Sequence, residues 1–118
     1  MKNNFDLHTH STDSDGKLDK EELIMHAQQE DFEALAITDH NIITLNGLKN
    51  LLEGMSDNKV SIIPGIEIDC NLPKRLHLLG YYIQDDEKIN NFLVAVKKEN
   101  EEKTLELIDI LQKIFNYM

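Results

Sequence analysis

The stretch DLHTHSTDSDG, residues 6–16, places two histidines and a group of acidic residues directly after a short apolar opening. Apolar and polar residues alternate from Phe5 to His8, which is typical of a short strand. Residues 11–18 are rich in Ser, Asp and Gly, so we expect a loop there. His8 and His10 lie two residues apart in an extended segment, so their side chains point the same way and can bind one ion together.

The rest of the chain alternates between strand and helix patterns. Asp19 is a good N-cap and Glu22 follows three residues later, as in a capping box, which predicts a helix over residues 20–30. Short apolar stretches predict further strands, and apolar residues at helical spacing predict further helices. The later elements are expected as a strand at 32–38, a helix at 44–55, strands at 59–68 and 75–83, and a long helix from about 86 to 116. This order predicts an α/β protein with a largely parallel sheet.

Composition narrows the class of protein. The 118 residues carry a formal net charge of −10, which argues against binding to a nucleic-acid duplex. The one cysteine, Cys70, excludes an intrachain disulfide and a cysteine-based zinc site, and fits a cytoplasmic location. No apolar signal core and no membrane-length apolar segment occurs, so we expect no membrane association.

Side chains suited to metal binding fall where strands are predicted to end. In parallel α/β sheets, functional residues gather at these carboxyl ends. Imidazole and carboxylate donors without thiolates suit Zn, Mn or Fe better than Mg or Ca, and are typical of catalytic sites with open positions. The candidate ligands are His8, His10, Asp15, His40, Glu67 and His77.

Each of these patterns alone has an ordinary structural explanation. Glu67 could be an edge carboxylate, and His77, among apolar residues, could be a core histidine. Their coincidence with the other candidates at strand ends favours a metal site. We interpret His26, inside the first helix, as structural and Asp13 as a turn residue. Asp39 could be a ligand, but orienting a neighbouring histidine is the more common role.

The segments DLHTHSTDSDG, AITDHN, IPGIEI and LHLLGYYI resemble, in order and spacing, the first motifs of the polymerase and histidinol phosphatase (PHP) family. The family fold is a distorted β/α barrel of seven strands, and its members include phosphatases, exonuclease-like enzymes and polymerase domains. The likeness is to small bacterial metal-dependent phosphoesterases in particular. It implies that residues 1–118 are the N-terminal portion of one PHP domain. The expected architecture is a partial barrel with about four of the seven strands and a long C-terminal helix.

The resemblance also implies up to three ions of Zn, Mn or Fe. His8 and His10 would hold the first, Glu67 would bridge to a second ion that His77 also holds, and Asp15 and His40 would hold the third. Of these residues, the resemblance makes Glu67, His8 and His10 catalytic as well.

The chain departs from the family pattern in two ways. The family's later histidine and Asp-X-His motifs have no counterpart here, so each ion would lack at least one protein ligand and fewer than three sites are expected. Asp31, after the first helix, replaces a glycine usual in relatives, at a turn that Asp tolerates less well.

Two functions follow from this interpretation. One is a phosphoesterase that hydrolyses a small phosphorylated substrate by metal-activated water, impaired by the absent ligands. The alternative is a non-catalytic metal-binding or interaction remnant of a PHP domain. A purely structural domain is a third interpretation. The sequence leaves open whether this chain alone is an active enzyme. Because about four strands cannot close a barrel, we also expect a homo-oligomer.

Overall fold

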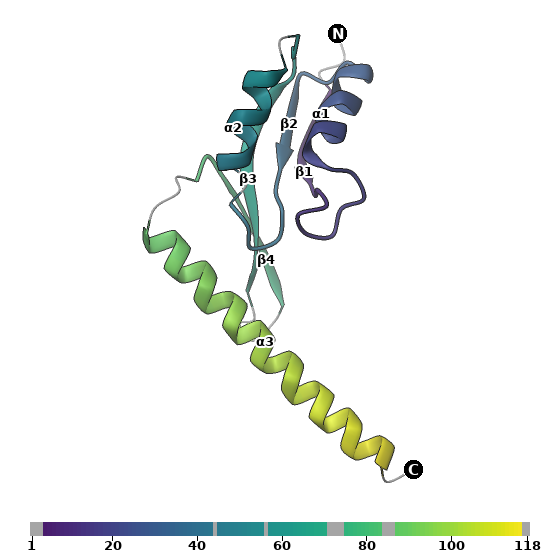
Figure 1. The fold of residues 1–118 in the computed structure, drawn as a ribbon, viewed down its shortest axis with the longest axis vertical. Coiled ribbons are helices and arrows are strands. Elements are labelled where there is room, and N and C mark those ends of the chain that lie inside the picture. The colour runs from purple at the N-terminus through teal and green to yellow at the C-terminus, as the bar shows by residue number, and fades with distance from the viewer. Residues whose placement is uncertain (1–3, 44, 56, 71–74, 84–86, 117–118) are drawn as a thin grey trace. The chain divides into compact units, whose positions relative to one another are not determined.

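The computed structural model describes residues 4–43, 45–55, 57–70, 75–83 and 87–116. The chain divides into two compact units, Met1–Asp85 and Asp86–Met118, so the prediction of one domain over the whole chain stays a prediction. The described elements include every predicted strand and helix, with ends shifted by a few residues. They are β1 (Phe5–Thr9), α1 (Lys20–Gln29), β2 (Ala34–Ile37), α2 (Leu45–Gly54), β3 (Ser61–Cys70), β4 (Leu76–Tyr81) and α3 (Glu87–Asn116) (Figure 1).

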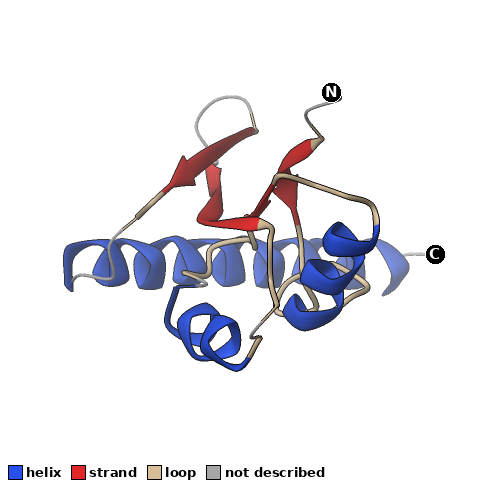
Figure 2. Ribbon diagram, turned by 90° about the horizontal axis from the view of Figure 1, so that it is seen from above, coloured by secondary structure: helices blue, strands red, loops and turns tan. Residues whose placement is uncertain are grey.

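The first unit is built on a four-stranded mixed sheet with the order β1-β2-β3-β4. β1 pairs with β2 and β2 with β3 in parallel, whereas β4 runs antiparallel to β3. The helices α1 and α2 make the two crossovers and lie on the same face of the sheet (Figure 2). The predicted α/β class is therefore confirmed, and the carboxyl ends of β1, β2 and β3 meet at one edge.

The predicted start of α1 is confirmed in atomic detail. The Glu22 backbone N–H donates to Asp19 Oδ1 at 2.9 Å, and the Asp19 N–H donates to Glu22 Oε2 at 2.9 Å, which completes the capping box. After the helix, Asp31 has a φ of 55°. The left-handed turn expected at this position is present, at the modest steric cost that a side chain carries there.

The core of this unit lies between the two helices and one face of the sheet. Ile62 of β3 packs against it, so alternation along β3 places Glu67 and Asp69 on the opposite face. The face of the sheet opposite α1 and α2 therefore carries Glu67 and Asp69. The buried core residues are Ile24, Ala27, Leu35, Ile37, Leu48 and Val60.

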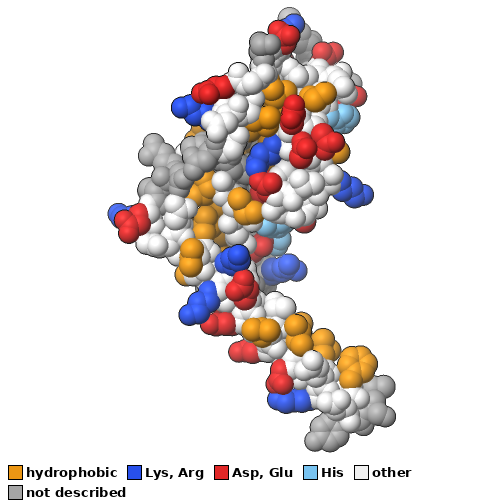
Figure 3. Space-filling view, in the orientation of Figure 1, with side chains coloured by type: hydrophobic (Ala, Val, Ile, Leu, Met, Phe, Trp, Pro, Cys, Tyr) orange, Lys and Arg blue, Asp and Glu red, His pale blue; other side chains and the backbone are white. Residues whose placement is uncertain are grey.

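The second unit is the single helix α3, with 30 residues. Apolar residues at helical spacing share one side of it, among them Phe92, Val96, Leu107, Leu111 and Ile114. Figure 3 shows hydrophobic side chains along its C-terminal half. A lone helix cannot bury such a side within its own unit. None of the helices in the described part of the chain combines the length and the apolar character needed to cross a bilayer.

Candidate metal centre

The predicted donors come from four strands or the segments that directly follow them. His8 lies in β1, His40 follows β2, Glu67 lies in β3 and His77 in β4. The structure brings all six predicted ligands together. Together with Asp69, their ligand atoms form three groups, each with all members within 4.8 Å: His8, His10 and Glu67; His10, Asp15 and His40; and His40, Glu67, Asp69 and His77.

Glu67 lies at the centre of the cluster, with only 3% of its surface exposed. Its Oε2 lies 2.9 Å from His8 Nε2 and 2.8 Å from His10 Nε2. Its Oε1 lies 2.5 Å from His77 Nδ1. The carboxylate therefore directs one oxygen toward the histidines of β1 and the other toward the histidine of β4.

The environment of Glu67 keeps its carboxyl group ionised. Burial raises its pKa, because it disfavours the charged form. Hydrogen bonds from His8 and His77 and the electrostatic influence of His40 and His8 outweigh burial, and hold the pKa of Glu67 at about 2 instead of 4.5. A negative charge is thus maintained at the centre of the cluster at neutral pH.

Backbone hydrogen bonds fix His40 beside Glu67. The Glu67 N–H donates to Asp39 O at 3.2 Å, and the Asn41 N–H donates to Glu67 O at 2.8 Å, so residues 39–41 extend the pairing of β2 with β3. As a result, His40 Nε2 lies 3.3 Å from Asp15 Oδ2 and its Nδ1 lies 3.2 Å from Asp69 Oδ1.

Asp39 does not take the role that its place in the sequence suggested. It is fully buried and accepts three hydrogen bonds of 2.7 Å, from the Ser11 N–H, the Ser11 hydroxyl and the Ser14 hydroxyl. Asp39 therefore fastens the loop that follows β1. Among the described residues, the aspartate beside the second nitrogen of His40 is Asp69.

The same loop depends on Gly16. The Gly16 N–H donates to Ser11 O at 2.9 Å, and a Cβ at this position would lie 2.0 Å from the backbone oxygen of His10. Only glycine fits this close approach. The resulting turn sets Asp15 Oδ1 2.9 Å from His10 Nδ1.

Asp69 is the donor that sequence reasoning missed. It lies two residues after Glu67 in β3, but one residue beyond the predicted end of that strand, so strand alternation would have indicated it only if the strand had been predicted to its true end. The two polar residues interpreted as structural lie outside the donor groups. His26 is exposed on α1, and Asp13 pairs with Lys20.

The donor set fits a divalent transition metal. Two ligands that bind one ion at ~2.0–2.2 Å lie roughly 3.0–3.5 Å apart. The His10–Asp15 and His40–Asp15 contacts, at 2.9 and 3.3 Å, are close to that spacing. Imidazoles with carboxylates and no thiolate favour Zn, Mn or Fe.

The fold and this cluster define a class of α/β proteins that collect imidazole and carboxylate donors at the carboxyl edge of an open sheet. The family model "PHP domain" matches residues 6–117, and the chain belongs to this family. The resemblance of its four motifs is thereby confirmed, together with the four-stranded part of the barrel and the long C-terminal helix.

Proteins with related sequences are named as hydrolytic enzymes. The chain is 31% identical over 115 residues to a 5′-3′ exoribonuclease of Haemophilus influenzae, covering 96% of this chain and 41% of that protein. It is 35% identical over 83 residues to a phosphoribosyl 1,2-cyclic phosphate 1,2-diphosphodiesterase of Eggerthella lenta, covering 68% and 31%. The chain thus spans about two fifths or less of the length of these relatives.

Solved structures agree on the fold. A protein of Bifidobacterium adolescentis described as a metal-dependent phosphoesterase superposes with a TM-score of 0.76 at 21% identity, covering 96% of this chain and 40% of that one. An amidohydrolase of Chromobacterium violaceum with bound sulfate and no metal gives 0.72 at 26% identity, covering 87% and 36%.

Proposed function

We propose that this chain is a metal-dependent phosphoesterase domain that hydrolyses a phosphate ester. The observation that carries the proposal is the buried, anionic Glu67 carboxylate shared by His8, His10 and His77. An ionised carboxylate with its two oxygens directed to different imidazoles is suited to bridging two ions. Membership of the PHP family supports the same chemistry.

The proposed ligands are the six predicted residues, and the proposed metals are Zn, Mn or Fe. Bound ions of this kind would polarise a phosphate group and lower the pKa of a bound water. The chain's own contribution is geometric. Glu67 remains charged at neutral pH, while Asp39 and Gly16 hold the loop that presents Asp15 to His10.

The proposed substrate is a small phosphorylated molecule. The net charge of −10 disfavours a nucleic-acid duplex. However, relatives from Haemophilus influenzae and Escherichia coli are named 5′-3′ exoribonucleases, which makes single-stranded RNA the second substrate class to test. A cytoplasmic location stays a prediction from cysteine usage.

The test, with added Mn²⁺, measures phosphate release from a generic aryl phosphate and the release of nucleotides from a short 5′-phosphorylated RNA as a second substrate. The variants His8→Ala and Glu67→Ala should lose the activity, because each removes a donor from the cluster. His26→Ala, which changes a histidine outside the cluster, should keep it. Activity that persists in Glu67→Ala would come from a contaminant and would contradict the proposal.

The alternative function is a non-catalytic metal-binding or interaction remnant. It is favoured by one observation: the three donor groups could hold metal ions whether or not a substrate is hydrolysed. Elemental analysis of protein never exposed to chelator separates the two. Bound metal without hydrolysis of either substrate supports the remnant.

We also propose that the chain forms a homo-oligomer. β1 and β4 are the two edges of the sheet, and edges of this kind can pair with another chain. Phe5 on β1 and Leu76 and Leu78 on β4 are more than half exposed. The apolar side of α3 offers a further surface for association.

A further inference from the structure

We propose that Asp69 is a metal ligand that completes a site with Glu67 and His77. This inference rests on the proposed metal-dependent function and goes beyond it, since Asp69 was not among the six expected ligands. The site would draw all three side chains from the paired strands β3 and β4, and it would take a divalent transition metal.

Strand register places the three donors on one face. Glu67 and Asp69 are two residues apart in β3, so both side chains project from the same side of the sheet. In the antiparallel pairing, Asp69 lies directly opposite His77. Directly opposed residues have Cβ atoms only about 4.5–5.5 Å apart, so the backbone itself brings the carboxylate and the imidazole together.

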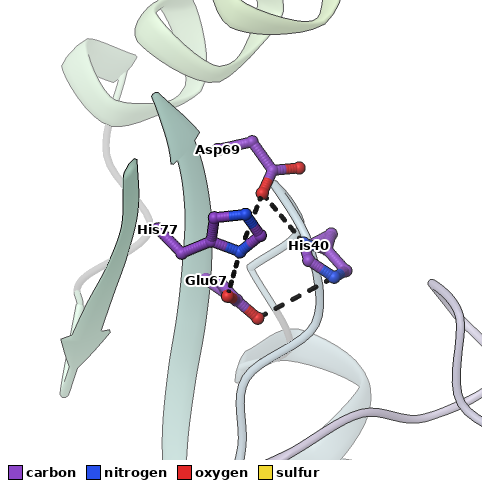
Figure 4. A group of neighbouring side chains, drawn as sticks. All are labelled: His40, Glu67, Asp69 and His77. Carbon is purple, nitrogen blue, oxygen red and sulfur yellow. Dashed lines mark hydrogen bonds and ion pairs between the residues drawn. The ribbon is translucent and has the colours of Figure 1, made fainter. Parts of the chain in front are cut away.

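Side-chain geometry agrees with the register (Figure 4). His77 Nδ1 faces both carboxylates, at 2.5 Å from Glu67 Oε1 and 3.5 Å from Asp69 Oδ1. An ion bound along the lone pair of this nitrogen would therefore meet both oxygens. The contact with Asp69 already has the spacing of two ligands on one ion bound at ~2.0–2.2 Å.

Asn41 holds the Asp69 carboxylate in place. The Asn41 side-chain amide donates to Asp69 Oδ2 at 3.3 Å, and the Asp69 N–H donates to Asn41 Oδ1 at 3.1 Å. Asn41 has a φ of 54°, a conformation that asparagine adopts more readily than most residues. Asp69 Oδ1 is thereby left directed at the histidines, as expected of a preorganised ligand.

A role limited to orienting His40 is the competing explanation. Asp69 Oδ1 lies 3.2 Å from His40 Nδ1 and can accept a hydrogen bond from it. This would leave His40 Nε2 free for the ion beside Asp15. The substitution Asp69→Asn separates the two roles. The amide that it introduces would keep a neutral oxygen acceptor for His40, but it would lose the negative charge that makes a carboxylate a good ligand.

The test measures bound metal. Wild type, Asp69→Asn and Asp69→Ala are stripped with chelator and titrated with Zn²⁺ by calorimetry, and the Co²⁺-loaded forms are compared by visible absorption. We expect both variants to lose one ion per chain, or to bind it at least ~10–100-fold more weakly, with a changed Co²⁺ spectrum. Asp57→Asn, the same change at an exposed aspartate outside the cluster, should match wild type.

The outcomes separate this inference from the function on which it rests. If wild type binds metal and Asp69→Asn binds as many ions as tightly, while circular dichroism shows both folded, Asp69 is not a ligand. If only Asp69→Ala loses an ion, Asp69 merely positions His40, which also overturns the inference. If wild type itself binds no ion, the proposed function fails and this site with it.

Asn41→Gly provides an independent variant, because glycine keeps the left-handed backbone but removes both side-chain bonds to Asp69. The Asp69 ion should bind more weakly, by ~10-fold or more. Unchanged affinity would contradict the inference.

Discussion

Glu67 is a buried carboxylate whose charge depends on the histidines around it. Its folded pKa of about 2 lies below the ordinary 4.5, so the unfolded chain takes up the proton more readily. The carboxylate therefore stabilises the folded, metal-free protein fully above pH 4.5, and this stabilisation is lost as the pH falls from 4.5 through 2.

The predicted consequence is a difference in pH profile between wild type and Glu67→Gln. In urea unfolding with chelator present, wild type should lose on the order of 3 kcal/mol more between about pH 5 and pH 2 than the variant, because glutamine does not titrate. Glu53→Gln, the same change at an exposed position of α2, should follow wild type. Parallel profiles for wild type and Glu67→Gln would contradict this account.

The individual donors differ in how far the sequence could predict them. The pairing of His8 and His10 could be predicted, because the two histidines lie only two residues apart in the sequence. Asp69 was missed because its place in the cluster depends on lying opposite His77 in the paired strands β3 and β4. The register of that pairing cannot be predicted from the sequence of either strand alone. Asp39 was misinterpreted because its partners are serines brought in by the folding of a loop.

The loop that follows β1 is an element whose shape depends on a single glycine. A methyl group at Gly16 would lie 2.0 Å from the backbone oxygen of His10, so the backbone must move in Gly16→Ala. We expect a loss of at least ~1–3 kcal/mol of stability, measured by thermal or urea unfolding. Gly54→Ala is the matched control, because a Cβ there meets nothing within 4 Å.

Metal binding should report the same movement locally. The loop places Asp15 against His10, so Gly16→Ala should weaken the ion held by His10, Asp15 and His40 more than the ion held by Glu67 and His77. Equal weakening of all bound ions would indicate a general loss of structure and would contradict a local role for Gly16.

Element types could be predicted more completely than element ends. Capping and periodicity are local properties, and α1 begins where the capping box predicts. The end of β3 was placed at residue 68, whereas the strand runs on to Cys70. Its last residues are held by pairing with β4, from Asp69 opposite His77 to Cys70 opposite Leu76. Pairing with β4 thus extends β3 by two residues that the local sequence pattern did not assign to the strand.

The molecule as a whole leaves apolar surface without a partner inside either compact unit. Within the second unit, α3 has no other element against which to pack, and Leu107, Leu111 and Ile114 recur on one side of it. Leu107, Leu111 and Ile114 are 56%, 44% and 52% exposed. Association of α3 helices from two copies would remove this surface from water, at roughly 25 cal/mol for each Å² of apolar area.

We therefore expect light scattering at micromolar concentration to give a mass above that of one 13.6 kDa chain. Leu111→Lys should lower the mass toward the monomer, because it places a charge in the middle of the apolar side. Leu105→Lys is the matched control: Leu105 is 66% exposed and lies two residues from Leu107, so it faces a different side of the helix. A wild-type protein that stays monomeric contradicts association altogether. An oligomer that both lysine variants leave intact would instead assign the contact to the sheet edges at β1 and β4, where Phe5 and Leu76 are exposed.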